Sequence, residues 1–290
     1  MFVATLIAPA GTLPTALPDA LRNALGGGDV VWLSPGRAAE FSIDVVPDHA
    51  DSLQADLQDQ AVDLAFLPAK NRRKRLLIAD MDSTMIEQEC IDELAAETGI
   101  GSGVSEITAR AMNGELDFEA ALTERVELLK GFPENLIDRV VQTRITYTPG
   151  GAALLATMKA QGAYAALVSG GFTAFTEAVA AHLGFDENRA NSLITENGVI
   201  TGRVGQPILG RDAKVTALND IARQLGITAE DAIAVGDGAN DLGMLGAAGM
   251  GVALHAKPSV QEQAEIVINN GDLTALLYLQ GYSDADIVGA

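Results

Sequence analysis

The sequence is poor in the residues that bind soft metals or form covalent cross-links. It has one cysteine, Cys90, and three histidines, His49, His182 and His255, among 290 residues. A single cysteine cannot form a disulfide within the chain and is typical of a reducing compartment, so we expect a cytoplasmic protein. The histidines are scattered without metal-ligand spacing, so zinc and other soft-ligand metals are not expected.

Basic residues are also scarce. Nineteen lysines and arginines stand against 39 acidic residues, which gives a formal net charge of −20. Such a surface repels the phosphates of nucleic acids, so no nucleic-acid partner is expected. It would repel a phosphorylated small molecule as well, so a site for one needs local positive charge. The short basic run at 72–75 is interpreted as a solvated linker.

Long hydrophobic runs are missing as well. No apolar stretch reaches the ~18–20 residues of a membrane span, and the first residues lack the basic region of a signal peptide, so no membrane partner is expected. What remains is a globular composition, with 48% hydrophobic and 20% charged residues. The length allows one large domain with additions, or two or three small ones.

The first 70 residues show the pattern of a small α+β domain. Strand-like and helical segments alternate in the order strand, helix, strand, strand, helix, strand, at residues 2–8, 13–25, 29–33, 41–46, 51–59 and 62–67. This order predicts a ferredoxin-like domain over residues 1–70. Domains of this kind bind amino acids or mediate dimers, and the pattern shows neither, so a homodimer stays open.

From residue 76 onward, short apolar runs alternate with helical stretches. The runs lie at 76–80, 164–169, 232–237, 250–254 and 266–268, and the helical stretches at 151–161, 173–183, 213–225 and 240–247. Continuous apolar strands are typical of a parallel sheet that is buried on both faces. The alternation therefore predicts a doubly wound, Rossmann-like α/β core over residues 71–89 and 148–290.

Two segments interrupt this alternation. Residues 90–147 have helical spacing throughout, which predicts a helical cap inserted directly after the first core strand. Residues 189–204 contain Asn197-Gly198 between two β-rich runs, which predicts a hairpin.

Polar side chains follow three of the predicted core strands. Asp80 and Asp82 follow the first, Ser169-Gly170-Gly171 follow the second, and "GDGAND" (236–241) follows the third. Because ligands bind beyond the carboxyl ends of strands in open α/β sheets, we expect the three clusters to meet. Each alone could be a turn or a helix cap, but together they predict a site.

The charges at this site require a cation. Asp80, Asp82, Asp237 and Asp241 are four acids at one edge. Two unit charges 4 Å apart repel by about 4 kcal/mol near a protein surface, so several pairs need neutralisation. Oxygen ligands favour Mg²⁺, which often binds one or two carboxylates together with a substrate phosphate.

The same edge carries groups that suit a phosphate. Lys214 lies at the start of a predicted helix, and the hydroxyl of Ser169 and the backbone N–H of Gly170 precede another. A metal, a cation and amide donors around two carboxylates are typical of phosphoryl transfer, with one aspartate as nucleophile and a second as acid and base. The glycine-spaced "GQPILGRD" (205–212) is rejected as a P-loop because Arg-Asp replaces Lys-Ser/Thr. Cys90 is interpreted as a buried thiol without a histidine partner.

Taken together, these motifs resemble those of a known family. "DMDST" (80–84), "VSGG" (168–171), Lys214 and "GDGAND" (236–241) are similar in order and spacing to the four motifs of the haloacid dehalogenase-like phosphatases, over roughly residues 70–285. The first 70 residues resemble the variable N-terminal domain of longer bacterial members. Met81 stands where many members have Phe.

The resemblance implies roles for individual residues. Asp80 would attack phosphorus, and Asp82 would act as acid and base. Asp80, the backbone carbonyl of Asp82, and Asp237 would bind Mg²⁺. The implied phosphate-binding and supporting residues are Ser169, Gly170, Lys214, Asn240 and Asp241.

Substrate recognition is implied for the cap. Glu89 resembles the family residue that contacts a substrate ammonium, and Arg125 the one that pairs with a substrate carboxylate. Met112 and Phe118 resemble apolar cap contacts. On spacing alone, Arg125 could equally be a solvated helix charge, and Glu89 an acid at a helix start.

The implied function is Mg²⁺-dependent hydrolysis of O-phospho-L-serine, a small-molecule substrate, through an aspartyl-phosphate. Two alternatives stay open. The first is an enzyme for another small phosphate, such as phosphohomoserine or phosphothreonine. The second is a noncatalytic sensor, against which the presence of both Asp80 and Asp82 argues.

Overall fold

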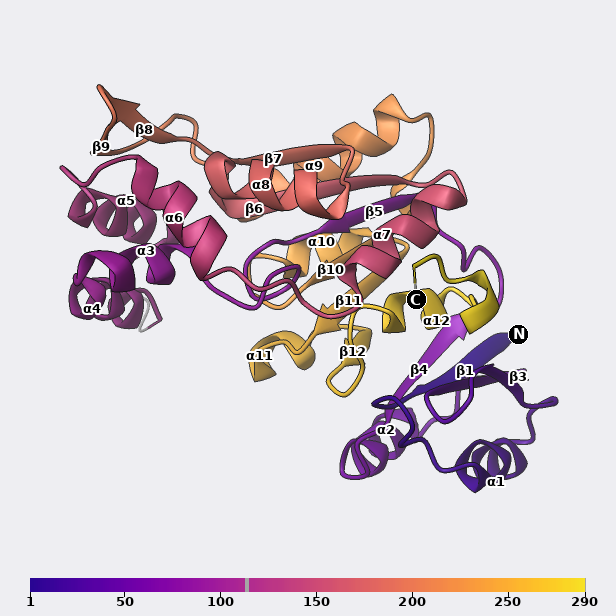
Figure 1. Cartoon of the computed structure of the whole chain (residues 1–290). Helices are drawn as coiled ribbons and strands as arrows, with labels where there is room; N and C mark the ends of the chain where they lie inside the picture. Colours follow the sequence, from indigo (N-terminus) through magenta and orange to yellow (C-terminus); the bar gives the residue numbers. More distant parts are fainter. Residues whose placement is uncertain (113–114, 290) are drawn as a thin grey trace.

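The structure, a computed structural model, describes residues 1–112 and 115–289, apart from the side chain of Met112. It contains a four-stranded sheet, a six-stranded sheet and a two-stranded hairpin. Figure 1 shows the helices of residues 90–143 at one end of the six-stranded sheet and the N-terminal sheet at the other. None of the helices in the described residues has the length and apolar character of a membrane span.

The N-terminal sheet is antiparallel, in the order β2-β3-β1-β4. Its elements are β1 (Phe2–Ile7), α1 (Ala16–Leu25), β2 (Val31–Ser34), β3 (Ala38–Ile43), α2 (Ala50–Gln58) and β4 (Asp63–Pro68). This is the predicted order of elements, but β3 begins three residues earlier than the strand expected at 41–46. Ala38 and Ala39, which carry little strand signal, pair with β1 and are fully buried.

The core sheet confirms the predicted doubly wound fold. Its six strands are all parallel, in the order β12-β11-β10-β5-β6-β7. They are β5 (Leu76–Ala79), β6 (Tyr164–Phe172), β7 (Glu187–Asn191), β10 (Ala232–Gly236), β11 (Met250–Leu254) and β12 (Ile266–Ile268). The chain proceeds from β5 to β6 and β7 on one side, and then to β10, β11 and β12 on the other. The order therefore reverses at β5, where α/β sheets bind their ligands.

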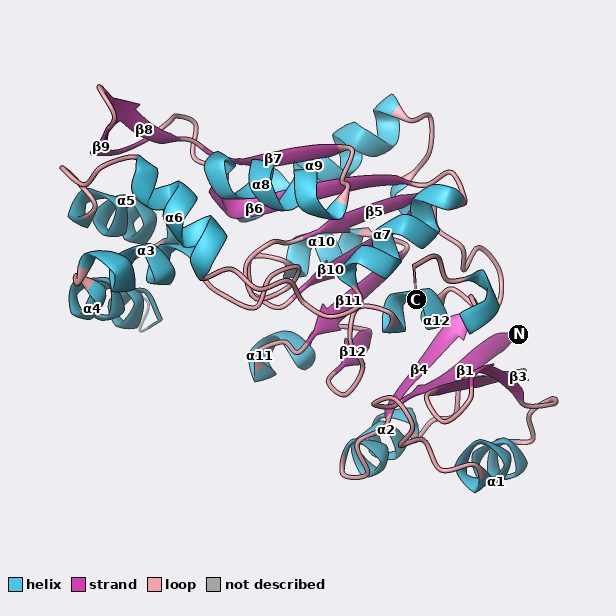
Figure 2. Cartoon of the chain, in the orientation of Figure 1, coloured by secondary structure: helices cyan, strands magenta, loops and turns pink. Residues whose placement is uncertain are grey.

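Helices cover both faces of this sheet, as Figure 2 shows. They are α7 (Gly151–Ala160), α8 (Thr173–Leu183), α9 (Arg211–Gln224), α10 (Leu242–Ala247), α11 (Pro258–Gln261) and α12 (Ala275–Leu279). Alternate residues of β5 pack into separate hydrophobic clusters, with Leu77 and Ala79 in one and Leu76 and Ile78 in the other. This period of two is why the strand is apolar throughout.

Strand β7 was not predicted as a core strand. Its sequence, ENRAN, is polar, and only its last residue, Asn191, is buried. It lies at the edge of the sheet, where β6 is its one neighbouring strand. The predicted hairpin follows it and is confirmed as β8 (Leu193–Glu196) and β9 (Val199–Val204).

The segment between β5 and α7 is helical, as predicted. It forms α3 (Cys90–Thr98), α4 (Gly101–Met112), α5 (Phe118–Leu128) and α6 (Asn135–Thr143). The β8–β9 hairpin is hydrogen-bonded to this helical unit: Gly131 N–H donates to Ile200 O at 2.9 Å, and Ile200 N–H to Phe132 O at 2.9 Å. Ile200 is fully buried among the cap's apolar residues. The helical unit is therefore attached to the core in two ways: by the chain connections after β5 and before α7, and by the β8–β9 hairpin.

The N-terminal sheet is held to the core by polar contacts. The buried carboxylate of Asp63 accepts hydrogen bonds from the backbone N–H groups of Asn269, Asn270 and Gly271 at 3.0, 2.9 and 2.9 Å. Arg72, in the basic linker, donates two hydrogen bonds to Glu40 at 3.2 and 2.6 Å. The linker is therefore part of a docked interface, and Arg72 is not solvated as the sequence suggested.

Candidate active site

The three strand-end clusters expected from the sequence lie together at the carboxyl edge of the core sheet. The backbone N–H of Asp80, directly after β5, donates to Val235 O of β10 at 3.0 Å. Thr84 donates its hydroxyl to Asp237, which follows β10, at 3.3 Å. Ser169 and Gly170 lie near the end of β6, which is the other neighbour of β5. The point where the strand order reverses therefore carries all three clusters.

A buried ammonium joins two of the carboxylates. Lys214 Nζ lies 2.7 Å from Asp80 Oδ1 and 2.5 Å from Asp241 Oδ1, and its side chain is 2% exposed. Burial alone would lower the pKa of Lys214, but the two carboxylates more than offset it and raise that pKa. Burial and the neighbouring Asp241 raise the pKa of Asp80 well above its ordinary value, while Lys214 opposes them. The ammonium therefore favours the anionic form of Asp80, while burial and Asp241 favour the protonated form.

The remaining acids leave negative charge without a partner. Carboxylate oxygens of Asp80, Asp237 and Asp241 all lie within 4.8 Å of one another. Burial, then repulsion from Asp241, raises the pKa of Asp237 to about 6. Three buried carboxylates against one contacting ammonium are two charges in excess. The site therefore fits a divalent cation, and in the described part of the chain its donor atoms are carboxylate oxygens without His or Cys.

Asp82 lies two residues after Asp80 with a different environment. Its Oδ1 accepts the backbone N–H of Cys90, the first residue of α3, at 3.1 Å. Burial, and then the nearby Glu89, raises the pKa of Asp82 to about 7. A carboxyl with a pKa near neutrality can give and take a proton.

The end of β6 forms a tight loop next to Asp82. Ser169 is buried, and its Oγ accepts the N–H of Gly171 at 2.9 Å. A Cβ on Gly171 would lie 2.9 Å from Asp82 Oδ2, and one on Gly170 would lie 3.0 Å from Phe118 of the cap. A side chain at Gly171 would therefore crowd Asp82, and one at Gly170 would require Phe118 of the cap to move.

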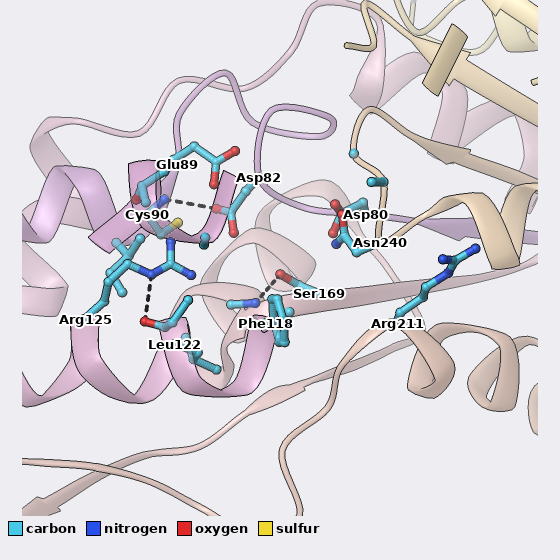
Figure 3. Close-up of a pocket in the computed structure, with 18 of the residues that line it drawn as sticks. Asp80, Asp82, Glu89, Cys90, Phe118, Leu122, Arg125, Ser169, Arg211 and Asn240 are labelled. Carbon is cyan, nitrogen blue, oxygen red and sulfur yellow. Dashed lines mark hydrogen bonds between the residues drawn. The ribbon is translucent and has the colours of Figure 1, made fainter. Parts of the chain in front are cut away.

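A cavity of about 660 Å³ connects this edge to the cap. Of the residues expected to form the site, its walls include Asp80, Asp82, Glu89, Phe118, Arg125, Ser169, Gly170, Asp237 and Asn240. Lys214 and Asp241 are not among the lining residues; they lie in contact behind Asp80. The side chain of Met112 lies outside the described residues. In Figure 3, Asp80 and Asn240 lie together, and Asp82 lies between them and Glu89.

The cap contributes a second polar end to the cavity. Glu89 accepts the Ser83 hydroxyl at 3.0 Å and makes no side-chain hydrogen bond that caps α3. Arg125 on α5 donates through Nε to the carbonyl of Ala121 at 3.2 Å, and it has no ion-pair partner among the described residues. Burial lowers the pKa of Arg125, and Asp92 and Glu89 oppose this. An acid and an unpaired guanidinium thus face the cavity.

Cys90 lines the same cavity but is not an activated nucleophile. Burial, and then the charge of Asp82, raises the pKa of its thiol far above the ordinary value. The thiol therefore stays neutral, as the sequence suggested.

Two cations of the cavity wall were missed in the sequence. Arg211 is the first residue of α9 and was set aside with the rejected glycine-spaced segment, and Lys257 follows β11. The charge of Lys257 lowers the pKa of Asp237, against the larger effects of burial and Asp241. Lys257 could have been found, because it follows a predicted strand as the other site residues do.

Comparison with known proteins agrees with this geometry. The sequence profile of the haloacid dehalogenase-like hydrolases matches residues 77–246. Phosphoserine phosphatase of Archaeoglobus fulgidus is 42% identical over 243 residues, which cover 82% of this chain and 70% of that protein.

Solved structures give the same result. A hydrolase of this family from Salmonella enterica serovar Typhi has a TM-score of 0.87 at 32% identity, covering 98% of this chain and 99% of its own. A phospho-aspartyl intermediate analogue of phosphoserine phosphatase has a TM-score of 0.66 at 41% identity, covering 71% of this chain and 98% of its own.

The fold and the carboxylate cluster define a class: a doubly wound α/β protein with an aspartate site at the switch point of its parallel sheet. The chain belongs to the haloacid dehalogenase-like hydrolase family. The resemblance inferred from its four motifs is confirmed.

Proposed function

We propose that the protein hydrolyses O-phospho-L-serine to L-serine and phosphate, the last step of serine biosynthesis. One observation carries the proposal: a single cavity has phosphoryl-transfer groups at the core end and, at the cap end, an acid with an arginine that has no ion-pair partner in the described part of the chain. The relatives named phosphoserine phosphatase support this substrate.

In the first half of the reaction, an Oδ of Asp80 attacks phosphorus and the bond from phosphorus to the seryl oxygen breaks. Asp82 gives its proton to the leaving oxygen, which its pKa of about 7 allows near neutral pH. The contact with Lys214 at 2.7 Å favours the ionised form of the attacking carboxylate. The phosphoryl group would then be bound to Asp80, within reach of Ser169 and the Gly170 backbone.

In the second half, Asp82 takes a proton from water as the water oxygen attacks phosphorus. The bond from phosphorus to the Asp80 oxygen breaks, and phosphate leaves. The same carboxyl thus serves as acid and then as base, so that Asp82 regains in the second half the proton that it lost in the first. Phe118 approaches the Gly170 backbone and would help to exclude bulk water from the first step.

We propose Mg²⁺ as the cation of the carboxylate cluster, held by Asp80, the backbone carbonyl of Asp82, and Asp237. Asp241 and Asn240 would support the metal and the phosphate. When bound, Mg²⁺ offsets the charge of the acids and of the phosphoryl oxygens. The oxygen-only donor set supports this choice.

Recognition of the amino-acid part is proposed for the cap. The carboxylate of Glu89 would bind the substrate ammonium, and the guanidinium of Arg125 the substrate carboxylate. Phe118, with Met112, would form the apolar contacts.

We further propose a division of the chain into an N-terminal domain (1–70), a core (71–89 and 148–290) and a cap (90–147), in a cytoplasmic protein. A homodimer through the N-terminal domain stays open.

Phosphate release from a panel of phosphomonoesters tests this function. We expect turnover of O-phospho-L-serine to exceed that of phosphothreonine, phosphohomoserine and p-nitrophenyl phosphate. Removing divalent metal with EDTA should abolish turnover, and Mg²⁺ should restore it. Preference for another member of the panel would replace the proposed substrate, and no release from any member would favour the noncatalytic sensor.

Replacing Arg125 with alanine tests the carboxylate contact. We expect kcat/KM for phosphoserine to fall by about 10²-fold or more, because a buried charge partner is lost. Turnover of p-nitrophenyl phosphate, which has no carboxylate, should change far less. Arg110→Ala is a matched control: it removes another cap arginine, paired with Glu124 at 2.7 Å, that does not line the cavity. An equal loss on both substrates would refute the assigned contact.

A further inference from the structure

The hydrogen-bond ladder between β6 and β7 is interrupted beside the catalytic groups. The register runs regularly to Val168↔Arg189 and resumes only at Phe172↔Asn191. Four residues of β6 thus advance against two of β7, and the two extra residues form a bulge within β6 at Ser169–Gly171, which we call the Ser169–Gly171 loop. Backbone groups in this loop have lost their strand partners and need others.

Asn191, the last residue of β7, supplies one. Its side-chain Nδ2 donates to the carbonyl of Gly170 at 2.9 Å. The same amide reaches a second segment: Nδ2 also donates to Leu209 O at 3.2 Å, and Oδ1 accepts the N–H of Leu209 at 2.7 Å. Asn191 is 2% exposed, so these contacts are not shared with bulk water.

Leu209 lies directly before the helix that carries the buried lysine. Gly210 is the N-cap of α9, Arg211 is its first residue, and Lys214 lies in its first turn. Fixing both backbone groups of Leu209 therefore fixes where α9 begins. That in turn sets the position of Lys214 Nζ between Asp80 and Asp241.

We propose that Asn191 is a positioning residue for the phosphate half of the site, because its one amide ties the Ser169–Gly171 loop to the start of α9. The role rests on the proposed function and extends it. Asn191 does not line the cavity. Among the proposed substrate-binding residues, its side chain is hydrogen-bonded to Gly170, at the backbone carbonyl. It acts through the two segments that hold the phosphate.

The contacts require an amide at this position. Two carbonyl oxygens face the donor and one N–H faces the acceptor, which only Asn or Gln can satisfy with one planar group. Aspartate has the same shape but would set a carboxylate oxygen against the carbonyls of Gly170 and Leu209. Alanine would leave three part-buried backbone groups without these partners.

The test is binding of inorganic phosphate by isothermal titration calorimetry in Mg²⁺, for the unchanged chain, Asn191→Ala and Asn191→Asp. We expect Kd for phosphate to rise about tenfold or more in Asn191→Ala, and further in Asn191→Asp. The Kd of the product L-serine, which the cap would bind, is measured by the same calorimetry and should stay unchanged. A merely structural residue would weaken both products together.

Thr176→Val is the matched control. The Thr176 hydroxyl is buried and donates to Asn188 Oδ1, on the same strand as Asn191, at 2.8 Å. We expect this variant to melt at a lower temperature and to bind phosphate as the unchanged chain does. Unchanged phosphate affinity in Asn191→Ala would overturn the inference, and so would an equal loss in Thr176→Val or an equal loss of L-serine affinity.

The measurement separates this inference from the proposed function. Phosphate binding by calorimetry needs no turnover. If the unchanged chain binds phosphate but does not hydrolyse phosphoserine, the proposed function fails, while the comparison of Asn191 variants still decides the role of the amide.

Discussion

Replacing Asp80 with asparagine is expected to abolish turnover of phosphoserine, with a loss of ~10⁴-fold or more. The amide cannot attack phosphorus, so no acid-stable phosphoryl label should appear on the protein after quenching with radiolabelled substrate. The fold should persist. In the absence of metal the variant should melt at the same temperature or higher, because it removes one of the crowded buried acids.

The control for this variant is Asp212→Asn. Asp212 is an exposed acid in the first turn of α9, three residues after Leu209. Its replacement by asparagine removes one negative charge, as Asp80→Asn does, and should leave turnover nearly unchanged. Substantial turnover by Asp80→Asn would contradict the assignment of the nucleophile, as would a phosphoryl label on another residue.

The sequence predicted the core because its strands are apolar on both faces. Leu76 to Ala79 could be recognised as a buried strand without knowledge of its neighbours. Strand β7 could not, because ENRAN at the sheet edge meets a single neighbouring strand and keeps its charges in contact with water. Strand β3 was displaced in the prediction because small alanines gave no signal, although pairing with β1 buries them.

The candidate site was predictable where its residues directly follow predicted strands. Asp80, Ser169 and Asp237 each follow an apolar run, and the topology of parallel sheets brings such positions together. The sequence predicted Lys214 as a cation that holds a phosphate oxygen and a carboxylate together, but not as the buried partner of both Asp80 and Asp241. Its burial between two acids depends on where α9 begins.

Asn191 illustrates what the sequence could not give. Its side chain is hydrogen-bonded to backbone groups of Gly170 and Leu209. Nearly every residue has these backbone groups, so the identity of the partners does not reveal such contacts in a sequence. They depend on a register shift that only the assembled sheet defines. The polar linker residue Arg72 was misread for a similar reason, since Glu40 is 32 residues away in the chain.

Replacing Lys214 with methionine is expected to damage both stability and turnover. Its side chain is 2% exposed and its ammonium contacts Asp80 and Asp241, so its loss leaves two adjacent buried acids without their partner. Breaking such a cluster costs about 3–5 kcal/mol. We expect that decrease in the free energy of unfolding, measured in urea with EDTA present, and a loss of turnover of ~10³-fold or more.

The double variant Lys214→Met/Asp241→Asn separates these two effects. Removing the Asp241 charge together with the ammonium relieves the repulsion, so much of the lost stability should return, while turnover should not, because the Asp80 carboxylate still lacks its cation. Lys159→Met is the control: Lys159 pairs with Asp186 at 2.7 Å near the surface, and its loss should cost no more than ~1 kcal/mol. If Lys214→Met unfolded at the same urea concentration as the unchanged chain, the ammonium would not be what balances the acids. If the double variant regained turnover, Lys214 would serve the fold alone, and the phosphate would be held by the cations of the cavity wall, Arg211 and Lys257.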